Sequence, residues 1–574
     1  MKSIAEIPVS VILECATNPE IFWAWVSEQH DAQMLEQASD EWLVRIRQRF
    51  QLEGVVAVCQ AYHQYAGKRG QAASYPIVTL CWALLLKHLN GWSYRRASWE
   101  IRTNGLVRWF VGYRLHDKTV SYVTLQRFAV WVNEHQPRLF FNEILKQINQ
   151  DFPVEAKQAQ VGDTFALLAN VGPQSRTALL CDTCRRLLDY WQQVDADDYA
   201  EALVLLNGEV LFGRPSEHAE YRLEKSARDG LEGRTALAAD ACLQLVQQRR
   251  SRWPTQRTLE FLALTKWAGY LAKLLRDEFV FGRNAAGVAQ TVRPCTKEER
   301  GSFVLGSTVD PEATFRKHGE KNDFGYNVQV AATINFIREI FAATGATSDA
   351  SGVALLIEHQ KAQLGLLPPK LIYDRAAGSP KIFHDVAKAS DGKTQLVARL
   401  IDHSQHCERF GPLDFTLNQD GSLTCPNQQS THTFYPSRSA DGDNYRFPAA
   451  QCQDCPHWQR CRGADRVPKA NKRKSPKPTA YRQVFISRYR ALQRKAILYT
   501  KTAQFKLDMQ FRSTIERIIA ALVRYNDARH AHSRGLLRAD FQARMAAIAY
   551  NLKKWHKLTL AKQKAALLRP PDAN

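Results

Sequence analysis

The sequence lacks any run of 18 apolar residues, and its 12 cysteines do not follow a secretory pattern. Because a helix needs roughly 18 or more apolar residues to cross a bilayer, we expect no membrane-spanning segment. The apolar segment 7–16 is preceded by Lys2 as its one basic residue and is interrupted by Glu14, which argues against a signal peptide. These absences predict a cytoplasmic protein with reduced cysteines, and clustered cysteines there bind metal more often than they form disulfides.

Acidic residues are scarce in the C-terminal part of the chain. From Cys461 to the end there are 27 Lys and Arg against 6 Asp and Glu, whereas residues 1–460 hold 51 of each sign. The net charge of +21 therefore arises entirely in the last 114 residues. Such a concentrated basic region predicts a polyanionic partner, nucleic acid first, although a generally soluble basic tail is the alternative.

The length of 574 residues, at ~150 residues per domain, predicts three or four domains. Hydrophobic residues make up 45% and charged residues 24%, as in ordinary folded proteins. The changes in pattern predict these units: an N-terminal lead (1–40), a helical DNA-binding domain (41–155), an α/β core in three pieces (156–173, 301–401 and 500–556), a helical insertion (174–300), a cysteine-rich insertion (402–465), a basic linker (466–499) and a basic tail (557–574).

The N-terminal block has helical periodicity, with apolar residues three and four positions apart from Ile77 to Leu85. Ser121 precedes an amphipathic helix that contains Leu125 and Phe128. This segment has the pattern of a helix-turn-helix reader of DNA, and a purely structural helix pair explains it equally well.

Strand patterns begin near residue 160 and resume after a long helical stretch, 174–282. The expected strands cover 160–169, 325–333, 337–344, 370–374 and 394–400, and the expected helices cover 350–363, 379–389 and 479–555. This order predicts a mixed α/β fold with a ribonuclease-H-like layer. The helical insertion then follows the first strand, and the cysteine-rich insertion follows the last.

Two aspartates lie where such a sheet would place a site. Asp163 is inside the first strand, and Asp374 ends a short buried strand, where ligands of α/β sheets usually bind. Phosphodiester chemistry by two metal ions needs acidic oxygens that converge on ions ~3.5–4 Å apart. Each aspartate could instead be a solvated or capping acid. Two other aspartates are rival candidates for an acidic metal ligand. We expect Asp349 at a helix N-cap, and the role of Asp310 stays open.

Glu516 is unusual on composition alone, because it is the single glutamate between Glu408 and the end of the chain. It lies in a predicted helix with Arg512 one turn before it and Arg517 beside it. We interpret Glu516 as a third metal ligand, and a surface ion pair is the simpler alternative.

The cysteine-rich segment has the spacing of a structural zinc site. Cys452-x2-Cys455 is followed after five residues by Cys461, and Cys425 lies upstream with 26 residues between it and Cys452. Four thiolates in a loop-rich segment suit tetrahedral Zn²⁺, and chance clustering of reduced thiols is the alternative. Cys181 and Cys184 have similar spacing but fall in a predicted helix, so we interpret them as helix packing.

With these residues in view, the chain from about residue 41 to 556 resembles the DDE transposases of bacterial insertion sequences, specifically the group numbered eleven eighty-two. The resemblance lies in the order of several short motifs. These are Gly162-Asp163-Thr164-Phe165, Asp310-Pro311-Glu312-Ala313, Gly325-Tyr326-Asn327-Val328-Gln329, Leu371-Ile372-Tyr373-Asp374, the cysteine series, and Arg512-x3-Glu516.

The sequence departs from the family pattern at a few positions. Arg375-Ala376-Ala377 follows the second aspartate where the family tends to have Gly-Tyr. Met509 and Val523 stand where related transposases have a tyrosine and a lysine, with Arg524 next to the latter. The three carboxylates are unaffected, but these departures bear on DNA contact and on whether this copy is active.

The resemblance implies an enzyme that cleaves DNA and transfers strands at the terminal inverted repeats of an insertion sequence. It implies two Mg²⁺ ions, with Mn²⁺ as an alternative, held by the three carboxylates, and a structural Zn²⁺ held by the cysteines. It further implies double-stranded DNA as the partner, a homodimer or larger assembly on that DNA, and association with the bacterial nucleoid.

Arg512 is expected to contact a phosphate near the scissile bond, with an ion pair to Glu516 as the alternative. The other expected DNA contacts are Arg517, Arg524, Lys472, Arg473 and Lys474. Two other functions stay open: a domesticated, inactive DNA-binding protein, and a metal-dependent nuclease without strand transfer.

Overall fold

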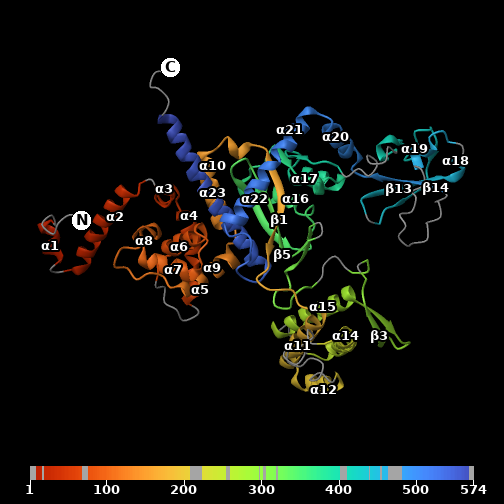
Figure 1. Cartoon of the computed structure of the whole chain (residues 1–574), viewed down its shortest axis with the longest axis horizontal. Coiled ribbons are helices and arrows are strands. Elements are labelled where there is room, and N and C mark those ends of the chain that lie inside the picture. The colour runs from red at the N-terminus through yellow and green to blue at the C-terminus, as the bar shows by residue number, and fades with distance from the viewer. Residues whose placement is uncertain are drawn as a thin grey trace.

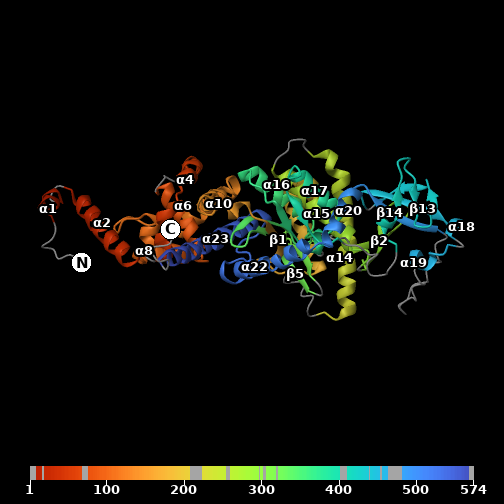
Figure 2. The same cartoon turned by 90° about the horizontal axis from the view of Figure 1, so that it is seen from above.

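The computed structural model describes residues 8–15, 18–39, 41–67, 75–206, 223–253, 259–296, 298–300, 305–318, 321–400, 410–438, 440–452, 455–462 and 481–567. A helical N-terminal part, a central sheet with its helices and a smaller β-rich part follow one another along the long axis (Figures 1 and 2). A further helical part lies beside the central sheet in Figure 1. Within the ranges described, no helix is both long and apolar enough to cross a membrane.

The N-terminal part is built from helices, as its periodicity predicted. They are α1 (Val9–Cys15), α2 (Pro19–Gln37), α3 (Trp42–Arg49), α4 (Glu53–Cys59), α5 (Ala61–Gly67), α6 (Ile77–Leu89), α7 (Tyr94–Thr103), α8 (Gly105–Val111), α9 (Tyr122–His135) and α10 (Leu139–Asp151). Ser121 is the N-cap of α9, and its side chain accepts a hydrogen bond from the Thr124 amide. Leu125 and Phe128 are fully buried, which confirms the amphipathic helix.

A six-stranded mixed sheet forms the centre of the molecule (Figure 1). Its strands are β1 (Gln160–Leu168), β4 (Thr314–His318), β5 (Lys321–Ala332), β6 (Ile337–Thr344), β7 (Lys370–Ile372) and β8 (Gln395–Val397). The order is β4-β5-β1-β7-β8, with β6 also paired to β5. β1 runs antiparallel to β5 and parallel to β7, and β7 runs parallel to β8. This topology is consistent with the predicted ribonuclease-H-like core.

Helices cover both faces of the sheet. On one face, α16 (Val353–Leu364) and α17 (Pro380–Ala389) share an apolar cluster with residues from β6, β7 and β8. On the other face, α22 (Ser513–Tyr525) and α23 (Leu536–Leu567) share a cluster with β1, β5 and the N-terminal helices. The N-terminal helical part therefore packs into one continuous core with this face of the sheet.

The segment between β1 and β4 has an apolar core of its own. It contains α11 (Arg176–Val194), α12 (Ala196–Leu206), α14 (Lys225–Arg249), η5 (Arg250–Arg252) and α15 (Leu259–Glu278). The prediction of helix up to residue 282 was wrong at its end, because β2 (Phe279–Arg283) and β3 (Ala289–Pro294) form a hairpin there. Cys181 and Cys184 are buried in α11, which confirms that they pack within a helix.

The cysteine-rich part is a small β structure, which sequence periodicity did not predict. Its elements are η8 (Pro412–Asp414), β9 (Thr416–Leu417), β10 (Leu423–Thr424), β11 (Ser430–Thr431), β12 (Phe434–Pro436), β13 (Gly442–Pro448), α18 (Ala449–Cys452), α19 (Trp458–Arg462) and β14 (Tyr481–Ser487). Strand β14 pairs with β13 along its whole length, although we had expected a linker to residue 499 and helix from 479. The cysteine-rich unit therefore includes residues after its last cysteine.

The chain returns to the core through α20 (Arg490–Thr500) and α21 (Ala503–Phe511). Arg512 is the junction between α21 and α22, and α23 follows to Leu567. Residues 557–567, which we had assigned to a basic tail, continue α23 as a helix.

Candidate active site

Asp163 lies in the middle of β1, where pairing with β5 holds its backbone in place. It is paired with Val330 of β5, and its side chain is 20% exposed. The Thr164 amide donates a hydrogen bond of 2.8 Å to Asp163 Oδ1. The carboxylate therefore has a defined orientation and is open to solvent over part of its surface.

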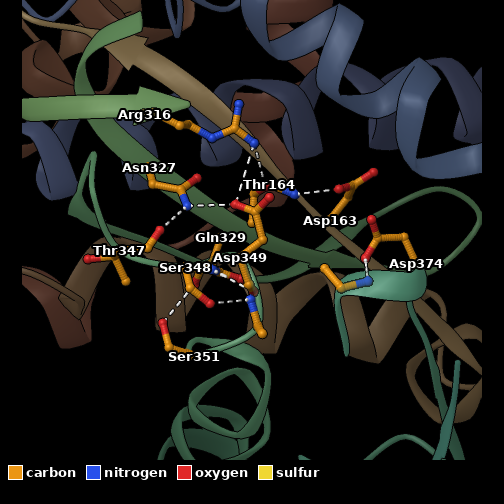
Figure 3. Close-up of polar contacts among 12 residues, drawn as sticks. Asp163, Thr164, Arg316, Asn327, Gln329, Thr347, Ser348, Asp349, Ser351 and Asp374 are labelled. Atoms are coloured by element: carbon orange, nitrogen blue, oxygen red, sulfur yellow. Dashed lines mark hydrogen bonds and ion pairs between the residues drawn. The ribbon is translucent and has the colours of Figure 1, made fainter. Parts of the chain in front are cut away.

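Asp374 lies two residues beyond β7, at the start of the short helix η6 (Arg375–Ala377). The parallel register aligns Val161 with Ile372, so its continuation brings Asp163 beside Asp374. Figure 3 shows the two aspartates next to each other. Asp374 Oδ1 accepts a hydrogen bond of 2.9 Å from the Ala376 amide, which fixes this second carboxylate as an N-cap.

The residues that precede the two aspartates are also neighbours. A Cβ on Gly162 would lie 2.7 Å from the ring of Tyr373, closer than real Cβ contacts come. Tyr373 is fully buried, and its hydroxyl donates a hydrogen bond of 2.9 Å to Gln329 Oε1. The absence of a side chain at Gly162 thus lets β1, which carries Asp163, approach the segment after β7 that carries Asp374.

Arg512 connects Glu516 to this pair. Its guanidinium lies 3.3 Å from Asp163 Oδ2 and 3.3 Å from Glu516 Oε1. Glu516 lies in the first turn of α22, and its side chain is 63% exposed. The ion pair with Glu516, which was the alternative expectation for Arg512, is present. The same guanidinium also contacts Asp163.

The electrostatics of Asp163 are those of a crowded acid. Burial is the main factor that raises its pKa, and repulsion from Asp374 and Asp349 raises it further. The Thr164 amide and the Arg512 guanidinium act in the opposite direction. A cation that binds between a partly buried carboxylate and a neighbouring acid relieves the repulsion between them. The surroundings of Asp163 therefore suit a divalent metal ion.

The acids do not form a ready-made metal site. Among the described residues, no group of three or more His, Cys, Asp or Glu side chains is placed to hold a metal ion. The two aspartates are adjacent, and Glu516 is connected to Asp163 through one guanidinium. The donor set still fits a hard divalent ion, because all three groups offer carboxylate oxygens.

The two rival acids have other partners. We expected Asp349 at the N-cap of α16, but that position belongs to Gly352. The Asp349 carboxylate instead accepts a hydrogen bond of 2.8 Å from Asn327. Asp310 is 1% exposed and accepts a hydrogen bond of 2.5 Å from the Tyr326 hydroxyl, so its carboxyl group is buried against β5.

Two comparisons identify regions of known type. Residues 424–556 match the family model of a transposase DDE domain, and residues 31–130 match that of a transposase domain called DUF772. Both matches support an insertion-sequence DDE transposase. The first match includes Glu516 and the cysteine series, and the second covers α3 to α8 and the start of α9. The comparisons with curated proteins and with solved structures gave no match.

The cysteines within the DDE-domain match lie around one cavity. Its volume is about 30 Å³, and its lining includes His457 and the four predicted cysteines, Cys425, Cys452, Cys455 and Cys461. Backbone hydrogen bonds between residues close in sequence form the turns between them, such as the bond of 3.2 Å that the Cys455 amide donates to the Cys452 carbonyl. The four thiols therefore line the same pocket. Among the residues described, however, no three of them are close enough together to hold a metal ion.

The predicted DNA contacts within the DDE-domain match divide into two groups. Arg517 and Arg524 are exposed on α22, the helix that carries Glu516. Lys472, Arg473 and Lys474 lie outside the described residues.

Sequence reasoning missed the polar residues around Asp349, namely Arg316, Asn327 and Thr164 (Figure 3). The available signal was the alternation of Asn327 and Gln329 with Val328 and Val330, which places polar side chains on one face of a buried strand.

Proposed function

We propose that this protein is a DNA transposase that cleaves DNA and transfers strands at the terminal inverted repeats of an insertion sequence of group eleven eighty-two. The observation that carries the proposal is that Asp163 lies beside Asp374 and is joined to Glu516 through the Arg512 guanidinium, on a sheet consistent with a ribonuclease-H-like core. The matches to two transposase domain models support the same activity.

In this proposal Asp163, Asp374 and Glu516 are the catalytic carboxylates and hold two divalent ions, Mg²⁺ or alternatively Mn²⁺. Bound there, the ions would activate a water or a 3′-hydroxyl and stabilise the leaving oxygen. The repulsion that raises the pKa of Asp163 supports cation binding, because a cation relieves it.

Arg512 then has a second role beside its ion pairs. A guanidinium can bind a phosphate through two parallel hydrogen bonds, and Arg512 lies between the carboxylates that would surround the scissile phosphate. We infer that Arg512 orients the DNA strand for attack. Arg517 and Arg524, farther along the same exposed side of α22, would contact phosphates on either side of the cut. Lys472, Arg473 and Lys474 would add non-specific contacts.

The N-terminal helices would recognise the terminal repeats. Residues 91–127 hold seven Lys and Arg against two Asp and Glu, whereas the rest of residues 1–460 holds 44 Lys and Arg against 49 Asp and Glu. Trp99 on α7 is 51% exposed, and the Arg102 guanidinium lies 4.9 Å from its ring. The Arg95 guanidinium lies 5.2 Å from the ring of Tyr122, the first residue of α9. An exposed face of arginines and aromatic rings is suited to DNA, so this face favours the DNA-reading alternative for α9.

The cysteine cavity would hold a structural Zn²⁺. Four thiols lie around one pocket, and the small β structure beside it has few buried apolar residues. A small unit of this kind is commonly stabilised by a metal. We further propose a homodimer or larger assembly on DNA, because two element ends must be joined together, and a cytoplasmic, nucleoid-associated location.

The deciding experiment compares wild type with Glu516→Gln on labelled DNA that carries the element ends, in the presence of Mg²⁺. Glutamine keeps the size and the helix but removes the charge, so we expect normal DNA binding and at least 100-fold slower cleavage, roughly the effect of losing one catalytic group. Glu358→Gln, an exposed glutamate in α16, is the matched control and should cut normally.

Each other outcome points to a different function. If Glu516→Gln cuts as fast as wild type, Glu516 is a surface acid and the proposed triad is wrong. If wild type binds the ends without cutting, the protein is a domesticated DNA-binding protein. If it cuts but joins no 3′-hydroxyl end to target DNA, it is a nuclease without strand transfer.

A further inference from the structure

Figure 3 shows a polar cluster around Asp349, next to Asp163 and joined to it through Thr164. Successive side chains of a strand point to opposite faces, so Thr164 points away from the face that Asp163 occupies. Thr164 is 8% exposed, and the cluster around it includes a buried arginine and an aspartate, Arg316 and Asp349.

Arg316 of β4 connects the cluster to β1. Its Nη2 donates a hydrogen bond of 2.7 Å to Thr164 Oγ1 and lies 3.5 Å from Asp349 Oδ1. The Arg316 side chain is 11% exposed, so its charge is largely shielded from water. A charge in such a place is costly unless a partner compensates it, and Asp349 is that partner.

Asp349 is itself held by its neighbours. Asn327 Nδ2 donates hydrogen bonds of 2.8 Å to Asp349 Oδ1 and 2.9 Å to the Thr347 carbonyl. Gln329 Nε2 donates a hydrogen bond of 3.1 Å to the Asp349 carbonyl. The loop after β6 is thereby fixed to β5, and Asp349 meets Arg316 in a defined geometry.

The cluster reaches Asp163 through one residue. Thr164 accepts the hydrogen bond from Arg316 with its side chain and donates the 2.8 Å hydrogen bond to Asp163 Oδ1 with its amide. A shift of Thr164 therefore changes the orientation of the Asp163 carboxylate. Asp349 also neutralises Arg316, which would otherwise add a buried positive charge behind a site that needs to attract cations.

We propose that Arg316 and Asp349 form a positioning pair that holds Asp163, through Thr164, in the orientation that binds a divalent ion. The proposal rests on the proposed function, because it assumes that Asp163 is a metal ligand. Neither residue touches the metal or the DNA in this proposal. They act as the outer partners that orient a ligand, whose loss in metal sites typically weakens metal binding about 10- to 100-fold.

The test measures Mn²⁺ binding by electron paramagnetic resonance on the full-length protein, independently of DNA cleavage. The variants are Arg316→Gln, Asp349→Asn and Thr164→Val, with Asp163→Asn as the reference for a lost ligand. We expect each of the three to weaken Mn²⁺ binding at least about tenfold. In the double variant Arg316→Gln/Asp349→Asn, the fold-decrease in Mn²⁺ affinity should be smaller than the product of the two single fold-decreases, because the two residues act as one unit.

The control is Arg283→Gln, which breaks an ion pair with Asp240 of 2.7 Å in the helical insertion and should leave Mn²⁺ binding unchanged. Thermal unfolding identifies any variant that does not fold. If the charge variants do not fold, Thr164→Val, which keeps the charges of Arg316 and Asp349, decides whether the pair affects Mn²⁺ binding. If the folded variants bind Mn²⁺ within twofold of wild type while Asp163→Asn does not, the positioning pair is refuted and the active site stands. If Asp163→Asn binds as well as wild type, the metal site and the positioning pair both fall.

Discussion

Gly162→Ala is the smallest change that should damage the proposed active site without touching a carboxylate. The added methyl group would lie 2.7 Å from two ring carbons of Tyr373 and 3.4 Å from the Val330 carbonyl oxygen. The ring cannot swing aside freely, because Tyr373 is fully buried and its hydroxyl is bonded to Gln329. Ordinary contact needs about 3.4 Å or more, so β1 and the segment after β7 must separate by several tenths of an ångström.

The expected cost follows from this overpacking. An extra methyl group in a well-packed interior typically costs about 1–3 kcal/mol, so the free energy of unfolding should fall by that amount. The cleavage rate should fall by more than the loss of stability alone would cause, because Asp163 and Asp374 directly follow the two residues that clash. A displacement of about 1 Å in a catalytic group can lower the rate by roughly 100-fold.

Thermal unfolding and a single-turnover cleavage assay on element-end DNA measure the two effects. Gly172→Ala is the matched control, since a Cβ there meets nothing within 4 Å, and it should behave as wild type. In a Tyr373→Leu background, Gly162→Ala should cost less than in wild type, because the ring that it meets is gone. The reasoning is refuted if Gly162→Ala unfolds and cleaves like wild type, or if its cost is the same in both backgrounds.

Three further predictions concern other parts of the chain. Lys87 is 2% exposed, and burial lowers its pKa from 10.5 to about 8, so its charge opposes folding below pH 8 and this cost is relieved as the pH rises from 8 to 10.5. Lys87→Met should therefore raise the free energy of unfolding by up to about 3 kcal/mol at pH 7 and by much less at pH 10, as measured by thermal unfolding. Purified wild type should carry about one zinc per chain by mass spectrometry, and Cys455→Ser should lose it whereas Cys295→Ser should not. Replacing Arg517 and Arg524 by alanine should lower the slope of log affinity against log salt by about 2, because each phosphate contact contributes about 0.9.

The parts that the sequence predicted well are those with strong local patterns. β1 and β7 were predicted to within two residues at each end, whereas their parallel pairing was not predicted. Glu516 was singled out by composition, and its role as a metal ligand stays a prediction, because its side chain is 63% exposed and is joined to Asp163 only through Arg512. The structure adds the contact between Arg512 and Asp163, residues 349 positions apart, which no local pattern indicates.

The wrong predictions followed local patterns that distant contacts override. Asp349 precedes α16 by a few residues and has the side chain of an N-cap, but tertiary contacts with Arg316 and Asn327 take its carboxylate. Strand β14 alternates buried Val484 and Ile486 with more exposed residues, a valid strand pattern, yet it is short and lies between a basic segment and a helix. In both cases the deciding partner lies more than 20 residues away along the chain.

The insertion after β1 explains how a small catalytic sheet tolerates more than a hundred added residues. The chain leaves and re-enters the core at nearly the same point, where the Gln174 amide donates a hydrogen bond of 2.8 Å to the Gly306 carbonyl and the Thr308 amide donates one of 2.7 Å to Gln174 Oε1. The insertion also buries its own apolar cluster, separate from that of the sheet. Because its ends are already joined and loop-closure entropy grows only slowly with length, the insertion places little strain on β1. Asp163 can therefore keep its register with β5 and β7 while the distant acid partners, Asp374 and Glu516, are supplied by chain segments that follow the insertion.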